Sequence, residues 1–164
     1  MPVGELHPFM LHFAVGLLLA APLCDTAGLL LRREALLLAG RWNTLIGTGA
    51  AVFSVATGLA AQGALGKHSA AGEALLHIHG ALGWLVVAVW VPVAVWRGAS
   101  KLPLPTRART LYLTGAFVGA ALVLSETVLG GMLVYRHGVG LSAAARAEPV
   151  PHGDARIGVE KTVR

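Results

Sequence analysis

Residues 75–96 read LLHIHGALGWLVVAVWVPVAVW, and this stretch decides the fold. It contains no Asp, Glu, Lys or Arg, and it lacks the strict alternation of apolar and polar residues that marks a half-buried strand. An α-helix needs about 20 predominantly apolar residues to cross the hydrocarbon core of a bilayer, which is roughly 30 Å thick. The stretch therefore predicts a transmembrane helix, with a kink near its end at Pro92.

Three further stretches have the same apolar character, and they cover residues 8–31, 42–61 and 110–135. Pro8 suits the first turn of a helix, where a missing N–H group costs no hydrogen bond. The segments between the stretches are short, so successive helices should run antiparallel. The sequence therefore predicts an all-α protein, a four-helix transmembrane bundle with up-down-up-down topology.

The composition agrees with a membrane protein of one domain. The chain has 164 residues, of which 55% are apolar and 13% are charged, whereas about 25% of the residues of soluble domains are charged. Residues 1–141 form the predicted transmembrane domain, and residues 142–164, rich in Ala, Pro and charge, form an extramembrane C-terminal tail. The net charge is +5, but the basic residues lie between the apolar stretches and at their ends. That placement is typical of a protein in a lipid bilayer, and no nucleic-acid partner is expected.

The basic residues also predict the orientation in the membrane. Most of those close to a span follow the first and third stretches: Arg32, Arg33, Arg41, Arg97, Lys101, Arg107 and Arg109. The other side has only Lys67, Arg136 and Arg146 close to a span. Segments rich in Lys and Arg stay in the cytoplasm. We therefore expect a multi-pass protein of the bacterial cytoplasmic (inner) membrane, with both termini in the periplasm.

The histidines all fall on the predicted outer side: His7, His12, His68, His77, His79, His137 and His152. His7 and His12 are separated by roughly 140° around a helix, since each residue turns the helix by about 100°. By the same geometry His77 and His79 are about 200° apart. Only one histidine of each pair can therefore face the interior of the bundle.

His12 and His79 lie deepest in the apolar zone, at similar depth on helices that are diagonal in an up-down bundle. Two neutral imidazoles that face each other across a bundle are the usual axial ligands of a b-type haem. We therefore predict one haem b near the outer face, bound by His12 and His79. His7 and His137 lie at the outer interface, where they are candidates for a metal or quinone-headgroup site, although capping and surface roles are commoner there.

Two acids lie inside the apolar stretches, where an ionised carboxylate is costly unless it faces protein. Glu126 is in the middle of the fourth stretch, and we expect it to make an interhelical polar contact or to serve in a proton relay. Asp25 lies late in the first stretch, from which it can reach Arg32, Arg33 or Arg41.

Two motifs at the ends of the bundle resemble those of a known family. Residues 6–13 read LHPFMLHF, similar to an HPxxVHF signature, and residues 130–140 read GGMLVYRHGVG, similar to GGxLVYxHGVG. Over residues 5–141 the chain resembles a bacterial four-helix membrane family catalogued as a domain of unknown function. Its members are sometimes fused to c-type cytochrome or Rieske domains, which implies redox work at the outer face. Met132 stands where that family carries an acid, and Glu126 is the candidate substitute.

These observations favour a membrane-embedded, b-type cytochrome-like redox subunit that passes electrons between quinol and an outer redox partner. Two alternatives stay open. One is a non-catalytic structural subunit of a larger membrane complex, with the tail docked on a partner. The other is a metal-handling or transport protein that uses the outer histidines.

The predicted orientation can be tested with a reporter enzyme fused after Arg164. A reporter that is active only in the periplasm should be active in this fusion, because the basic segments 32–41 and 97–109 resist translocation. A matched fusion within residues 97–109 should be inactive. Activity in the second fusion and not in the first would invert the topology and move every histidine to the inner face.

Overall fold

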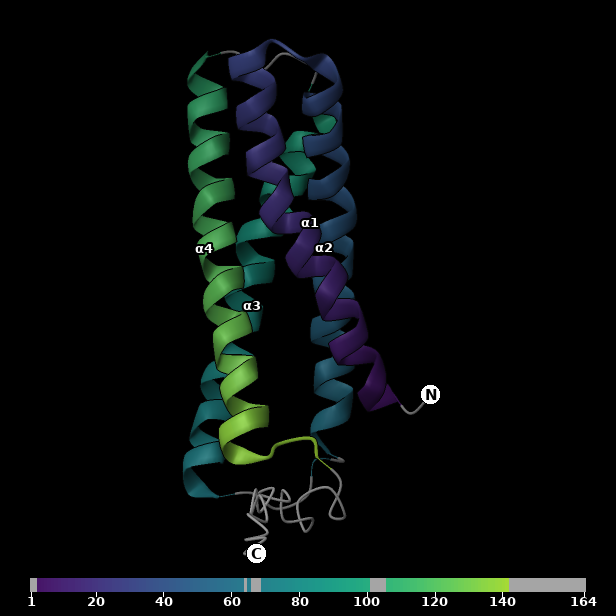
Figure 1. Cartoon of the computed structure of the whole chain (residues 1–164), viewed down its shortest axis with the longest axis vertical. Helices are drawn as coiled ribbons and strands as arrows, with labels where there is room; N and C mark the ends of the chain where they lie inside the picture. Colours follow the sequence, from purple (N-terminus) through teal and green to yellow (C-terminus); the bar gives the residue numbers. More distant parts are fainter. Residues whose placement is uncertain (1–2, 64, 66–68, 101–105, 142–164) are drawn as a thin grey trace, which may run out of the picture.

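The computed structural model describes residues 3–63, 65, 69–100 and 106–141. Within them the chain forms four α-helices, α1 (Val3–Leu31), α2 (Glu34–Gln62), α3 (Ala70–Ala99) and α4 (Thr106–His137). The helices run alternately up and down a single elongated bundle (Figure 1). The predicted all-α, four-helix fold is therefore confirmed, while the predicted tail, residues 142–164, lies outside the described residues.

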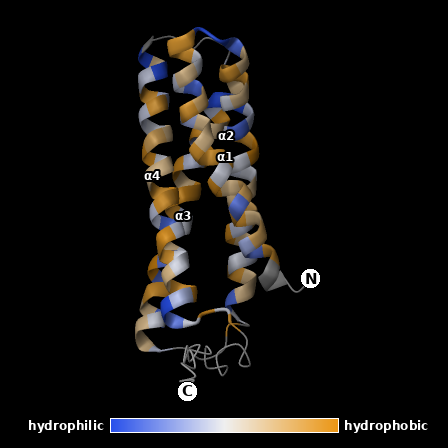
Figure 2. Ribbon diagram, in the orientation of Figure 1, coloured by the Kyte–Doolittle hydropathy of each residue, from blue (hydrophilic) through white to orange (hydrophobic). Residues whose placement is uncertain are grey.

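The four helices have the length and the surface of membrane-spanning segments. They contain 29, 29, 30 and 32 residues, which corresponds to about 44 to 48 Å at 1.5 Å per residue. All four are long and apolar enough to cross a membrane, and apolar residues dominate most of their length (Figure 2). The helices exceed the roughly 30 Å of hydrocarbon, so their last turns reach the level of the lipid headgroups.

The helix boundaries differ from the predicted spans mainly at the ends. Only Arg32 and Arg33 separate α1 from α2, because the chain turns at Arg32 with a φ of 53° and the next helix begins at Glu34. Most of the predicted segment 32–41 is thus helical. An acidic residue in the first turn, here Glu34, stabilises the positive end of a helix dipole. Pro92 lies inside α3, which continues to Ala99.

The backbones of neighbouring helices pack closely together. In the described residues α1 packs against α2 and α4, and α3 packs against the same two helices. Within those residues no close backbone approach joins α1 to α3 or α2 to α4. These two pairs are therefore the diagonals of the bundle, and any contact across a diagonal is made by side chains alone.

Small residues let the neighbouring helices approach closely. A Cβ atom added to Gly119 of α4 would lie 2.7 Å from the ring of Trp90, which is fully buried on α3. A Cβ atom on Gly47 of α2 would lie 2.8 Å from Leu18, which is fully buried on α1. Lipid supplies no hydrophobic drive for helix association, so close backbone packing of this kind contributes much of the stability.

A buried polar network, here called the four-helix network, joins all the helices near one end of the bundle. Arg97 of α3 donates hydrogen bonds from Nη2 to Asp25 Oδ1 of α1 at 2.6 Å and to the Leu37 carbonyl of α2 at 2.8 Å. Tyr112 of α4 donates from its hydroxyl to Asp25 Oδ2 at 2.5 Å. The hydroxyls of Tyr112 and Thr44 lie 3.3 Å apart. One carboxylate therefore links the diagonal pair α1 and α3 as well as α4.

The predicted partners of Asp25 were wrong. The carboxylate pairs with Arg97, not with Arg32, Arg33 or Arg41. Arg32 and Arg33 are exposed in the turn beyond α1, and Arg41 donates to a backbone carbonyl of α3 at 2.5 Å. Arg97 reaches the carboxylate because α3 continues past the predicted end of the span and carries the side chain into the interior.

The packing at Gly119 gives a test of the fold. Gly119→Ala should lower the free energy of unfolding by about 1–3 kcal/mol, because the added methyl group would overlap the immobile Trp90 ring. Gly131→Ala is the matched control on the same helix, since a Cβ atom at Gly131 meets nothing within 4 Å. Thermal denaturation of the purified protein in detergent, followed by circular dichroism, measures both. Equal stability of the two variants would contradict the packing described here.

Candidate functional site

The end of the bundle opposite to the four-helix network holds a second polar group, which we call the histidine cluster. It consists of His7 of α1, Ser54 of α2, His79 of α3 and Glu126 of α4. The rings of His7 and His79 lie next to each other across the diagonal, with their centroids 6.4 Å apart and their planes perpendicular in a T-shaped contact. The cluster therefore gathers one residue from every helix around the space between α1 and α3.

Each imidazole of the cluster has an oxygen beside its Nδ1 atom. His7 Nδ1 donates to the Ser54 carbonyl at 2.7 Å, and His79 Nδ1 lies 3.1 Å from Glu126 Oε1. The side chains of His79 and Glu126 are only 13% and 12% exposed. The hydrogen bond fixes the orientation of the His7 ring and leaves its other nitrogen, Nε2, free to act as a ligand. His79 Nδ1 makes no hydrogen bond within the described residues, so its contact with Glu126 is electrostatic.

The structure does not bring His12 and His79 together. His12 is exposed on the outside of α1, where its Nδ1 donates to the Pro8 carbonyl of the same helix at 2.5 Å. The predicted pairing across the diagonal is made by His7 instead. The rotation argument holds, since one histidine of α1 faces inward, but depth was the wrong criterion for choosing it. Because α1 begins at Val3 and not at Pro8, His7 is already part of the helix and lies on its inner face.

The remaining predicted residues have separate surroundings. His77 is exposed, with Nε2 3.3 Å from Glu73 Oε1 one turn earlier in α3. His137, at the end of α4, packs against Gly72 in the first turn of α3. The metal site of His7 and His137 stays a prediction. In the described part of the chain no three His, Cys, Asp or Glu side chains are grouped so that they could hold a metal ion. His68 and His152 lie outside the described residues.

Three glycines make room for the cluster. A Cβ atom added to Gly58 of α2 would lie 3.0 Å from the His7 ring, and one added to Gly130 of α4 would lie 3.3 Å from the His79 ring. A Cβ atom on Gly83 of α3 would lie 3.2 Å from Glu126 Oε1. The side chains of His7, His79 and Glu126 thus each rest against the backbone of another helix. A glycine on a neighbouring helix at the same level, here Gly58 beside His7, is the sequence signal that distinguishes the inward-facing histidine of α1.

Each polar end of the bundle has a recess. The recess beside the four-helix network measures about 240 Å³ and the one beside the histidine cluster about 410 Å³, both measured to their open mouths. The polar lining of the larger recess comes from His7, Ser54 and Glu126, and the rest is apolar, including Val86 and Val123. Ser54 Oγ and Glu126 Oε2 are buried without a hydrogen-bond partner among the described residues. Buried polar atoms normally have a partner, so these two atoms are available to a bound molecule or a proton.

The contact between Glu126 and His79 generates a prediction. Glu126→Gln should leave the stability of the bundle nearly unchanged, because an amide keeps a polar atom beside His79 Nδ1. Glu126→Leu should lower the free energy of unfolding by about 1–3 kcal/mol, the cost of leaving a buried polar group unpaired. Ser125→Ala is the control, since that exposed side chain bonds only to its own helix. Thermal denaturation measures the stability of each variant. If Glu126→Leu is as stable as Ser125→Ala, the contact between Glu126 and His79 does not stabilise the bundle.

Comparison with known proteins agrees with the architecture. A family model described as "Predicted membrane protein (DUF2231)" matches residues 4–143, a region that covers α2, α3, α4 and all of α1 except Val3. Among curated proteins and among solved structures, no match to the chain was found.

Proposed function

The chain belongs to the predicted membrane protein family DUF2231, whose model matches its residues 4–143, and from that premise we propose that it is a membrane-embedded, b-type cytochrome-like redox subunit. His7 and His79 would hold one haem b at the histidine end of the bundle. The basic residues gather at the other end, so the rule that basic segments stay in the cytoplasm assigns the haem to the periplasmic side of a bacterial inner membrane. There the subunit would pass electrons between quinol and an outer redox protein.

The observation that carries the proposal is the placement of the two imidazole rings. They come from diagonal helices, and their centroids are 6.4 Å apart. Two imidazoles that hold one metal ion at bond lengths of about 2 Å must lie within several ångströms of each other. His7 and His79 are close enough together for both of them to hold one haem iron, to which they would be the protein's ligands.

The donor set also favours a haem over a bare metal ion. Zinc in proteins is usually held by three or four protein ligands, whereas a haem iron needs only one or two ligands from the protein. The cluster offers two imidazoles, and among the described residues no three His, Cys, Asp or Glu side chains are grouped so that they could hold a metal ion. Within the same residues α1 and α3 make no close backbone approach, which is compatible with a macrocycle between them.

The surrounding residues have defined parts in this proposal. The Ser54 carbonyl and the Glu126 carboxylate would orient the two ligands through Nδ1, as oxygens commonly do for metal-bound histidines. Gly58 and Gly130 would keep space beside the rings. A bound haem would supply one-electron oxidation and reduction. Glu126, whose Oε2 is unpaired in the described structure, would accept a proton when a quinol is oxidised nearby.

Absorption spectroscopy of the purified chain tests the proposal. We expect a Soret band and an α-band that appears on reduction, with one haem per chain. His7→Ala and His79→Ala should each remove most of the haem, because a single axial imidazole holds it weakly. His12→Ala and His77→Ala are the matched controls, each the outward-facing histidine of the same helix, and both should retain it.

The other outcomes separate the alternatives. A colourless protein that carries copper or zinc would overturn the haem proposal in favour of metal handling. A colourless protein without metal would leave the structural subunit of a larger complex as the better hypothesis. Loss of haem in His12→Ala but not in His7→Ala would show that a haem is bound by a different pair of ligands from the one proposed.

A further inference from the structure

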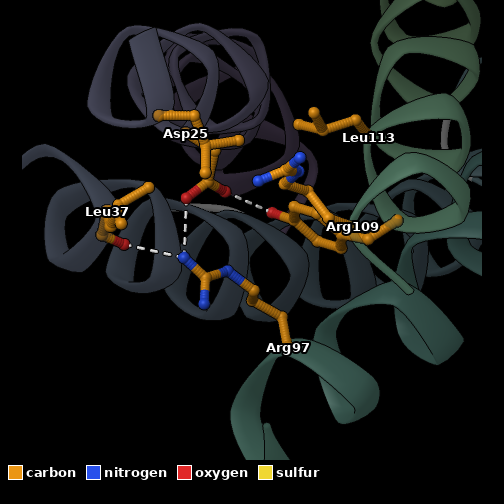
Figure 3. Close-up of a pocket in the computed structure, with 7 residues that line it drawn as sticks. Asp25, Leu37, Arg97, Arg109 and Leu113 are labelled. Atoms are coloured by element: carbon orange, nitrogen blue, oxygen red, sulfur yellow. Dashed lines mark hydrogen bonds and ion pairs between the residues drawn. The ribbon is translucent and has the colours of Figure 1, made fainter. Parts of the chain in front are cut away.

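The four-helix network borders a second recess, which we call the arginine pocket. Its lining comes from all four helices: Asp25, Leu29, Leu37, Arg97, Arg109, Tyr112 and Leu113. The recess measures about 240 Å³ to its open mouth. Figure 3 shows Arg97 on one side of Asp25 and Arg109, from α4, on the other. Both arginines thus belong to the lining of the same small space at the basic end of the bundle.

Arg97 has hydrogen-bond donors left over. Its side chain is 1% exposed, and Nη2 serves both Asp25 and the Leu37 carbonyl. Its Nε and Nη1 atoms are buried and have no hydrogen-bond partner among the described residues. A guanidinium carries five N–H donors in a planar fork, and leaving such donors unpaired away from water is costly. The geometry therefore leaves Arg97 short of an acceptor.

The charge in the pocket is also unbalanced. Asp25 is the one carboxylate of the lining, and its two oxygens are already used by Arg97 and Tyr112. Arg109 is partly buried, and no described carboxylate lies within ion-pair distance of it. Two guanidinium groups thus share one acid. An anion with one negative charge would neutralise the lining and supply the missing acceptors.

We propose that the arginine pocket binds the phosphate group of an anionic phospholipid. Arginine forks match the oxygens of phosphate in pairs of parallel hydrogen bonds. Arg97 is in the last turn of α3 and Arg109 is near the start of α4, which is the level of the headgroups because the helices exceed the hydrocarbon thickness. Basic pockets between transmembrane helices are known binding sites for anionic headgroups.

The rest of the lining indicates a lipid as the source of the phosphate. Leu29, Leu37 and Leu113 are the other side chains of the pocket, and they offer apolar contact to the glycerol and upper acyl carbons that adjoin a lipid phosphate. A free phosphate ion would gain nothing from these side chains. The proposal is independent of the haem, since the pocket shares no residue with the histidine cluster.

The test compares lipid retention by the full chain and by two arginine variants. The protein is purified in detergent and offered phosphatidylglycerol and phosphatidylcholine of equal chain length, and bound lipid is counted by native mass spectrometry. Arg109→Gln removes a pocket cation without touching the network around Asp25. Arg107→Gln removes an exposed cation two residues earlier on the same helix. The wild type and Arg107→Gln should prefer phosphatidylglycerol by roughly tenfold, as expected for charged hydrogen bonds, and Arg109→Gln should lose that preference.

Three results would overturn the proposal. Equal retention of the two lipids by the wild type would mean that the pocket does not select an anion. Equal loss in Arg107→Gln and Arg109→Gln would assign the preference to general surface charge. Displacement of phosphatidylglycerol by millimolar inorganic phosphate would show that the pocket takes free phosphate, not a lipid. The haem spectrum of Arg109→Gln should match the wild type, which separates failure here from failure of the proposed redox function.

Discussion

The ion pair between Asp25 and Arg97 joins α1 to α3, a diagonal pair of helices whose described residues make no close backbone contact with each other. Hydrophobic attraction cannot hold α1 to α3 in a bilayer, because lipid is as apolar as leucine. The 2.6 Å contact between the two side chains, extended by Tyr112 to α4 and by the Leu37 carbonyl to α2, supplies that link at one end. Removing one partner would leave an uncompensated buried charge. The register of all four helices therefore depends on it.

The opposite end of the same diagonal has a different character. There the His7 and His79 rings meet in a perpendicular contact without a hydrogen bond between them, and each has a neighbour outside the diagonal, the Ser54 carbonyl of α2 for His7 and the Glu126 carboxylate of α4 for His79. One end of the diagonal is thus closed by an ion pair, and the other end holds two imidazole rings side by side. A bundle pinned at one end can keep this spacing at the other without help from α1–α3 packing.

Most of the fold could be predicted from the sequence, because long apolar stretches without charge have only one stable form in a bilayer. The errors arose where a residue near the end of a stretch had to be assigned to a helix or a loop. Arg97 was counted with a loop, so its pairing with Asp25 was missed. The choice between His7 and His12 failed for a related reason: apolar residues occur on every side of a lipid-exposed helix, so periodicity does not reveal the inner face. Glu126 was recognisable because an acid inside an apolar stretch needs a protein partner.

Each polar end contains one acid, but only Asp25 is paired with an arginine. Both oxygens of Asp25 are engaged, one by Arg97 and one by the Tyr112 hydroxyl. Glu126 lies beside His79, and an imidazole can be neutral or charged. In the function proposed above, a proton would therefore enter or leave the His79–Glu126 pair without breaking the ion pair that joins α1 to α3. Asp25 thus holds the helices together at the arginine end. Glu126, at the histidine end, is suited to the proton-coupled redox chemistry proposed for the cluster.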